Sequence, residues 1–300
     1  MLVAISGSSG LVGSALASSL IRDGHTVRRL VRREARGSDE VSWNPEGSEI
    51  DARGLHGIDA IVNLAGVNIA QRWTRDAMRE IHESRVRATA LVARTSASLS
   101  PRPRALVSGS AVGYYGLRGG EVLDETSAAG DDFLACVCKD WEAATAPARD
   151  AGIRVAISRT GIVLDPHGGA LAKMLLPFRL GVGGHLGDGT HWMSWIALVD
   201  AVRALRFLIE NERAAGAFNL TAPNPVDNAE FTRVLASVLH RPAIFPVPQL
   251  ALELLYGPMA KGAALASQRA LPRRLLDSGF AFALPDLRSA LEAILRPKAA

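Results

Sequence analysis

Short apolar runs alternate with longer amphipathic segments along the first two thirds of the chain. The apolar runs predict strands at Leu2–Ser6, Thr26–Val31, Ala60–Asn63, Arg104–Ser108 and Arg154–Arg159, with a short addition at Val41–Trp43. Helical spacing between them predicts helices at Ser14–Arg22, Asp76–Leu99 and Phe133–Asp150. This alternation predicts an α/β fold in which a doubly wound parallel sheet carries helices on both faces.

The pattern changes after Leu164. We expect a helix from Gly168-Gly169 to Leu176, a glycine-rich aromatic stretch, and then the elements Ala197–Glu210 (helix), Ala217–Leu220 (strand) and Ala229–Leu239 (helix, with Asn228 as its N-cap). From Leu250 onward the chain is helical in composition and is interrupted by prolines. The chain therefore divides into a nucleotide-binding part at 1–164, a smaller substrate-side lobe at 165–248 and a short helical C-terminal appendage at 249–297.

Composition narrows the class of protein. With 48% hydrophobic residues, the 300-residue chain can bury a sizeable core, and disorder is excluded. The net charge of +4 comes from scattered arginines without aromatic or motif support, so we expect no nucleic-acid partner. No apolar run approaches the roughly 20 residues that span a bilayer, and no leader pattern precedes the first strand.

The two cysteines, Cys136 and Cys138, are one residue apart. This spacing suits neither an ordinary disulfide nor a zinc knuckle, so it favours the reducing cytoplasm. His185 and His191 have no clear partners in the sequence, and we expect no metal site.

A glycine-rich turn directly follows the first predicted strand. Gly7 permits the turn, Gly10 lets the backbone approach a pyrophosphate, and Gly13 lets the next helix pack close to the strand. The spacing is G-x-x-G-x-x-G, and an ordinary tight turn is the alternative. Its position between a strand and a helix favours a dinucleotide site of the Rossmann type.

The end of the second strand indicates which dinucleotide binds. An acidic residue there selects NAD, but this chain has Arg32 and Arg33 and no carboxylate. A guanidinium forms a planar, permanently charged fork for a 2′-phosphate. We therefore expect NADP(H), although arginines that merely solvate a loop are the alternative. After the third core strand, small residues at Leu64-Ala65-Gly66 would let the chain pass close to the adenine side, or would simply form a loop exit.

These motifs resemble the extended short-chain dehydrogenase/reductase superfamily. The general matches are GSSGLVG, NLAG, SGSAVGYYG (Ser108–Gly116) and RTGIVL (Arg159–Leu164). A narrower resemblance, to an atypical branch of the NAD-dependent epimerase/dehydratase family, rests on RWT, KDWE, GGALAKMLLPFRLGVGG, GDGTHWMSWI, FNLTAPNPV and ALPRRLLDSGFAF. The ordered matches cover nearly the whole chain, and the tail is similar to a C-terminal domain of unassigned function.

The resemblance implies a set of cofactor contacts. Gly7, Ser9, Gly10, Leu11 and Val12 would surround the pyrophosphate, and Arg32 would hold the 2′-phosphate with Arg33 beside it. The remaining matched positions would lie along the cofactor, toward its adenine or its nicotinamide end: Leu64, Ala65, Gly66, Glu80, Arg85, Ser108 and Ile162.

Superfamily catalysis uses a serine, and a tyrosine and a lysine spaced Y-x-x-x-K on one helix. Ser110 matches the serine and Lys139 is a plausible lysine, but the residue four before Lys139 is Ala135. A methyl group cannot transfer a proton. Tyr114 or Tyr115 would be replacements, or else pocket packing. Cys136 and Cys138 are weaker candidates, better read as small apolar groups.

Three tryptophans are candidate substrate contacts: Trp73, Trp192 and Trp195. Flat rings in a glycine-rich segment suit a binding loop, whereas core packing is the alternative. We expect an NADP(H)-dependent oxidoreductase or epimerase-like enzyme that acts on a small carbonyl or sugar-like molecule, with a non-catalytic NADP(H) sensor or scaffold as the alternative. Relatives of this fold often pair through two long helices, which suggests a homodimer.

Overall fold

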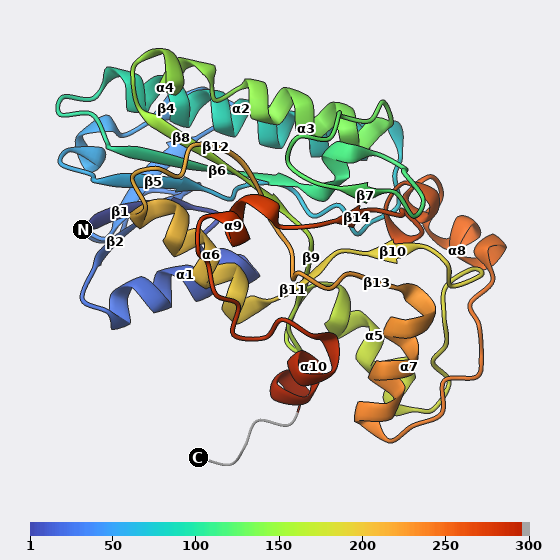
Figure 1. The fold of residues 1–300 in the computed structure, drawn as a ribbon. Helices are drawn as coiled ribbons and strands as arrows, with labels where there is room; N and C mark the ends of the chain where they lie inside the picture. The colour runs from blue at the N-terminus through green and yellow to red at the C-terminus, as the bar shows by residue number, and fades with distance from the viewer. Residues whose placement is uncertain (296–300) are drawn as a thin grey trace.

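The computed structural model, which describes residues 1–295, is built on one eight-stranded sheet (Figure 1). The strand order is β12-β8-β6-β5-β1-β2-β3-β4, and every neighbouring pair is parallel except β3 and β4. The strands are β1 (Leu2–Ser6), β2 (Thr26–Val31), β3 (Glu40–Asn44), β4 (Glu49–Ile50), β5 (Ala60–Asn63), β6 (Ala105–Ala111), β8 (Arg154–Thr160) and β12 (Gly216–Leu220). The predicted Rossmann-type, doubly wound sheet is confirmed.

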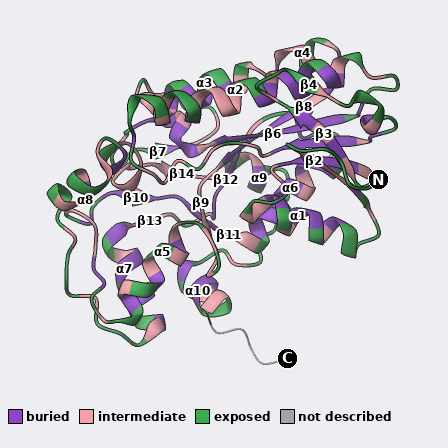
Figure 2. Ribbon diagram, turned by 180° about the vertical axis from the view of Figure 1, so that it is seen from behind, coloured by how far each residue is buried: buried purple, intermediate pink, exposed green. Residues whose placement is uncertain are grey.

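Helices cover both faces of this sheet (Figure 1). On one face lie α1 (Leu11–Arg22) and α6 (Leu198–Glu210), and on the other lie α2 (Arg75–Ser98), α3 (Phe133–Ala143) and α4 (Ala146–Asp150). Figure 2 shows buried strands between helices whose outer sides are exposed. No helix within residues 1–295 is long and apolar enough to cross a membrane.

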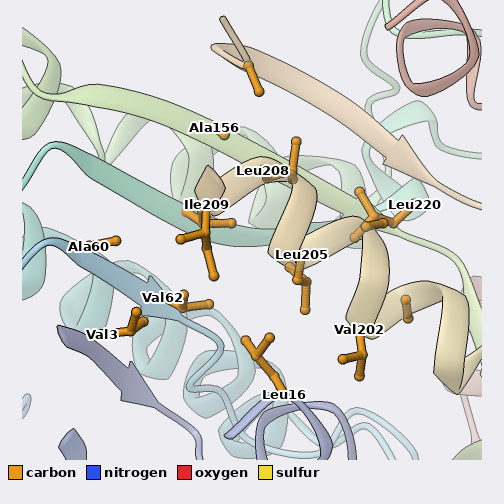
Figure 3. Packing of buried hydrophobic residues seen from close by; sticks show 14 of the residues in the cluster. Val3, Leu16, Ala60, Val62, Ala156, Val202, Leu205, Leu208, Ile209 and Leu220 are labelled. Atoms are coloured by element: carbon orange, nitrogen blue, oxygen red, sulfur yellow. The ribbon is translucent and has the colours of Figure 1, made fainter. Parts of the chain in front are cut away.

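Alternating strand residues supply the two halves of the core. Val3 and Val62 point toward α1 and α6, where Leu16, Leu205 and Leu208 meet them (Figure 3). The intervening residues of the same strands pack under α2 and α4. Buried on both faces, the parallel strands are apolar almost throughout, which is why their short runs were legible in the sequence.

Many predicted bounds differ from the observed ones by one to three residues, and two differences have a specific physical cause. The helix expected over Phe133–Asp150 is divided after Ala143, where the Thr145 hydroxyl donates to the Glu142 carbonyl at 2.7 Å and Pro147 offers no N–H. The N-cap of the Ala229–Leu239 helix is Asp227, whose carboxylate accepts from the Glu230 amide, and not Asn228. Asn228 is instead buried and accepts from the Leu186 amide at 2.7 Å.

A smaller lobe forms beyond the end of β8. Its strands make two pairs, and its helices pack around Trp195 and Phe231. The elements are β9 (Ile162–Leu164) with β11 (Trp195–Ala197), β10 (Trp192–Met193) with β13 (Val226–Asp227), and the helices α5 (Gly169–Arg179) and α7 (Asn228–Leu239). Because β9 continues directly from β8, this lobe lies against the carboxyl edge of the sheet (Figure 1).

The C-terminal residues extend over both lobes. They form α8 (Gln249–Tyr256), a π-helical turn (Ala260–Ala264), β14 (Arg269–Ala270), α9 (Arg273–Asp277) and α10 (Leu287–Leu295). Leu275 and Phe280 are buried in the core of the large sheet, whereas Leu287 and Leu291 are buried in the smaller lobe. Strand β14 pairs with β7 (Val122–Leu123). Residues 296 and 297, the last of the predicted appendage, lie outside the described residues.

Candidate active site

The glycine turn after β1 has the tight geometry that its sequence predicts. Gly7 has a φ of +67°, and a Cβ there would lie 2.7 Å from the Leu64 carbonyl oxygen. A Cβ on Gly13 would lie 2.2 Å from the Gly7 carbonyl oxygen. Any side chain at these two positions would push apart β1, α1 and the chain after β5, so the backbone requires glycine.

The N-terminus of α1 is open. Gly10 is the N-cap, and among the described residues no side chain caps the first turn. Ser9 and Gly10 are exposed, and Leu11 and Val12 are half-buried. Backbone N–H groups at an uncapped helix N-terminus attract an anion, because they lack partners and lie at the positive end of the helix dipole.

A buried hydrogen-bond network shapes the chain that faces this turn. The Ser6 hydroxyl donates to Asn63 Oδ1 at 2.5 Å and accepts from the Leu64 and Ala65 amides at 3.2 and 3.3 Å. Asn63 Nδ2 in turn donates to the Thr89 hydroxyl on α2 at 2.7 Å. The ends of β1 and β5 are thereby fixed together, with Leu64 and Ala65 half-buried beside Gly7.

The two arginines at the end of β2 are not equivalent. Arg33 forms a bidentate ion pair with Glu40, at 2.7 and 2.5 Å. That guanidinium, followed by the Arg36 amide, lowers the pKa of Glu40 to about 2. Arg32 is exposed, and no hydrogen bond or ion pair joins it to any residue between 1 and 295. Its positive charge is therefore available, whereas that of Arg33 is already neutralised.

Arg85 of α2 lies behind the loop that follows β5. Its guanidinium donates to the carbonyls of Ile81 and Val67, each at 3.0 Å, and lies over the Trp141 ring at 5.2 Å from the centroid. Burial lowers its pKa, and no carboxylate within residues 1–295 pairs with it. A Cβ on Gly66 would lie 3.0 Å from the Arg85 Cζ, so the exposed Gly66 lies against a half-buried positive charge.

Glu80, predicted beside Arg85, is exposed on α2. Its side chain forms no hydrogen bond or ion pair with the described residues. Ser108 is also not open to a ligand, because it is fully buried within β6 and its hydroxyl faces the Gly109 carbonyl at 3.4 Å. Ile162, by contrast, is half-buried at the start of β9, where its amide donates to the Ser194 carbonyl.

The Ser110 side chain is hydrogen-bonded to a buried ionic network. Its hydroxyl donates to Glu142 Oε1 on α3 at 2.7 Å. Arg159 of β8 donates two hydrogen bonds of 2.9 Å to the same carboxylate, and the Arg159 side chain is only 6% exposed. Because the Ser110 hydroxyl donates its only proton to this carboxylate, the Ser110 oxygen can only accept further hydrogen bonds in this arrangement.

The two tyrosines after Ser110 have different environments. Tyr115 is fully buried, donates to Asn219 Oδ1 at 2.7 Å and accepts from Arg159 at 3.2 Å. Burial raises its pKa to about 12, which makes it a poor acid or base near neutral pH. Tyr114 is half-buried, carries the Arg159 guanidinium 3.4 Å from its ring centroid, and has a hydroxyl with no hydrogen bond to the described residues.

The structure does not bring Lys139 to Ser110. Lys139 is exposed on α3, and its side chain has no hydrogen bond or ion pair with the described residues. The preceding residue, Cys138, is the one whose side chain reaches the end of β6, with its Sγ 3.8 Å from the Ala111 carbonyl. Burial raises the Cys138 pKa to about 11. Both cysteines are free thiols, Cys136 exposed and Cys138 buried. The lysine position facing Ser110 is therefore held by a neutral thiol.

Two of the three predicted substrate tryptophans are core residues. Trp195 is fully buried, with its Nε1 donating to the Asn224 carbonyl, and Trp73 is 5% exposed and donates to the Ile69 carbonyl. This burial favours core packing, the alternative given for both residues. Trp192 is half-buried, and the Arg269 guanidinium lies 4.0 Å from its ring centroid.

Sequence reasoning missed the residues that build the network around Ser110. Glu142 and Arg159 were noticed only as letters of the KDWE and RTGIVL motifs, and Asn219 as part of FNLTAPNPV. A signal was present, because Arg159 is a charge within a buried strand and thus required a partner. Ser6, which joins β1 to β5, carried no such signal.

Comparison with known proteins agrees with this geometry. A family model described as NAD dependent epimerase/dehydratase family matches residues 3–221, and one described as a domain of unknown function (DUF1731) matches residues 247–294. The epimerase family protein MT2273 of Mycobacterium tuberculosis is 46% identical over 281 residues, which is 93% of each chain.

Two solved structures are similar as well. The crystal structure of human epimerase family protein SDR39U1 (isoform 2) with NADPH superposes with a TM-score of 0.91 at 34% identity, covering 99% of this chain and all of that one. A nucleoside-diphosphate sugar epimerase from Corynebacterium glutamicum gives a TM-score of 0.82 at 40% identity, covering 98% of this chain and 58% of that one. The chain therefore belongs to the NAD-dependent epimerase/dehydratase family.

Proposed function

We propose that this protein binds NADP(H), with the diphosphate on the glycine turn and the 2′-phosphate on Arg32. The observation that carries the proposal is an uncapped helix N-terminus and an unpaired guanidinium at the ends of the adjacent strands β1 and β2. Together they match the two anionic groups of this dinucleotide. The human relative crystallised with NADPH supports the choice of cofactor.

The proposal includes an oxidoreductase or epimerase-like activity on a small carbonyl or sugar-like substrate. When bound, the cofactor supplies hydride exchange at a carbonyl or carbinol carbon. Ser110 holds the substrate oxygen. While its hydroxyl donates to Glu142, Ser110 can accept a hydrogen bond from a substrate hydroxyl. It polarises a substrate carbonyl only after its O–H turns from Glu142 toward the carbonyl oxygen. Tyr114 is the nearby acid or base candidate, because its hydroxyl is unbonded within residues 1–295.

One observation favours a second candidate, a non-catalytic NADP(H) sensor or scaffold. The helix that supplies the tyrosine and lysine of related enzymes here presents Cys138, whose pKa burial raises to about 11, and leaves Lys139 in solvent. The neutral Cys138 thiol is a poor proton donor or acceptor at neutral pH, and a positioned acid or base contributes about 10²–10⁴-fold to such reactions.

Calorimetry and a turnover screen test the two parts separately. We expect the nucleotide-free protein to bind NADPH more tightly than NADH, and absence of heat with either nucleotide would refute the cofactor site. Carbonyl compounds, alcohols and nucleotide sugars are then screened by NADP(H) absorbance. Turnover that falls in Ser110→Ala and Tyr114→Phe supports the enzyme. Turnover unaffected by both variants contradicts these roles, and no turnover with intact binding supports the sensor.

A further inference from the structure

The stretch 267–274 of the C-terminal region, which we name the inner segment, is threaded between the sheet and the smaller lobe. Its strand β14 runs parallel to β7 and lies beside it in Figure 1. The Ser194 hydroxyl donates to the Gln268 carbonyl and accepts from the Ala270 amide, both at 2.8 Å. The Thr221 hydroxyl donates to the Ala270 carbonyl at 3.1 Å. Ser194, Thr221 and Ala270 are buried, so the middle of the inner segment is packed into the protein, whereas Arg273 near its end is exposed.

The inner segment touches the Ser110 network through Asn219. Asn219 Nδ2 donates to the Leu271 carbonyl at 2.9 Å, and its Oδ1 accepts from the Tyr115 hydroxyl at 2.7 Å. Asn219 and Tyr115 are both fully buried, so water does not compete for these bonds. A side-chain amide thus joins the backbone of the C-terminal region to the tyrosine that adjoins the ionic network.

This bond fixes the orientation of the Asn219 amide, and with it the donor role of Tyr115. The Leu271 carbonyl can only accept, so the amide of Asn219 must turn its NH₂ toward the inner segment and its oxygen toward Tyr115. Tyr115 must then donate its proton to Asn219, which leaves its oxygen to accept from Arg159 Nη1. The remaining N–H groups of that guanidinium fork are thereby aimed at Glu142, the partner of Ser110.

The Glu125 carboxylate also joins Asn219 to the inner segment. Glu125 Oε1 accepts from the backbone amides of Asn219 at 2.9 Å and of Arg274 at 3.3 Å. The side chain is mostly buried, and this burial raises its pKa. The Arg274 guanidinium also donates to the Ala217 and Ala215 carbonyls, each at 2.7 Å, which ties the end of the inner segment along β12.

We propose that the inner segment is a positioning element of the active site: through Asn219 and Tyr115 it sets the orientation of Arg159 and Glu142, and so the direction in which the Ser110 hydroxyl points. This gives the C-terminal domain a role, as an internal brace of the reactive end of the sheet. It rests on the proposed function only in taking Ser110 as the reactive position.

Alkylation of Cys138 tests this inference, because that thiol lies against the residue after Ser110 and is protected only while the end of β6 stays packed. All variants are made in the full-length chain carrying Cys136→Ser, so that iodoacetamide reports one thiol. Glu125→Ala removes the carboxylate that joins Asn219 to the inner segment. Glu125→Gln keeps an acceptor oxygen for the two amides. Asn224→Ala is the matched control, because it removes a bond from the same C-terminal region, to the Pro285 carbonyl, at a distance from the network.

We expect Glu125→Ala to raise the Cys138 alkylation rate about tenfold over Asn224→Ala, and Glu125→Gln to restore most of the protection. The NADPH dissociation constant should change less than about threefold, because four strand spacings of about 4.8 Å separate β12 from β1. Equal rates in Glu125→Ala and Asn224→Ala overturn the inference, as does acceleration that simply follows the loss of melting temperature across all variants.

If Glu125→Ala fails to fold, Gln268→Ala replaces it, since this change removes only the bond from Gln268 Nε2 to the Gly116 carbonyl. The same tenfold and equal-rate outcomes then apply. Absence of NADPH binding by the unmodified protein would refute the proposed function but would leave the alkylation comparison intact.

Discussion

The glycine turn and the Ser110 network lie at the same edge of one sheet but are built in opposite ways. The turn depends on missing side chains: Gly7 and Gly13 have no room for a Cβ, and the ligand-facing groups are backbone amides. The network depends on side chains alone, with Glu142 and Arg159 paired in the interior. The first site is fixed by local backbone shape, and the second by charges brought from distant parts of the chain. Changes in the two should therefore have separable effects.

The largest expected effect is loss of stability from Glu142→Ala. This change leaves the Arg159 guanidinium buried without a carboxylate, which costs about 3–5 kcal/mol of unfolding free energy. Urea denaturation measures the loss. Glu83→Ala is the control, because it removes an exposed i, i+4 pair with Arg87 and should cost at most about 0.5 kcal/mol. Equal losses in the two variants would show that the network is not the buried charge pair described above.

A smaller and more selective effect is expected at the nucleotide end. Arg32→Ala should raise the NADPH dissociation constant about 10- to 100-fold, because a charge-assisted hydrogen bond contributes about 1.5–3 kcal/mol. NADH binding, which involves no 2′-phosphate, should not change. Arg33→Ala is the matched control, since that guanidinium is already occupied by Glu40. If Arg33→Ala weakens NADPH more than Arg32→Ala does, the assignment of the phosphate is reversed.

The same contrast explains how far the sequence alone could reach. The turn, its strand and its helix lie within the first 22 residues, so spacing and residue type predicted them, and the strand bounds of β1, β2 and β5 were correct. The sequence predicts that Arg32 holds the 2′-phosphate with Arg33 beside it, and the ion pair between Arg33 and Glu40 distinguishes the two arginines in the structure. The spacing predicts Lys139 as the lysine of the superfamily, but residue types alone do not show that Lys139 is exposed on α3 while the Cys138 side chain reaches the end of β6.

Long-range contacts set the limit. Asn219 meets Tyr115 across 104 positions, and the Leu271 carbonyl across a further 52. No local pattern encodes either pairing. The tryptophans illustrate the same point: a glycine-rich aromatic segment fits a binding loop and a packed lobe equally well, and the burial of Trp195 decides for packing.

The smallest expected effect concerns the pH dependence of the Arg33–Glu40 pair. Its hydrogen bonds hold the pKa of Glu40 at about 2 in the folded protein, against an ordinary value of 4.5. A carboxyl group whose folded pKa is depressed adds stability above its unfolded pKa, and that stability is lost as the pH falls from about 4.5 toward 2. The Arg33→Ala variant should therefore melt slightly below the unmodified protein at pH 6, and the gap should close as the pH falls below 4.5. Because the pair is exposed, 1 M salt should also narrow the gap at pH 6. A gap that persists unchanged below pH 2 would show that Arg33 stabilises the end of β2 by packing and not through its pair with Glu40.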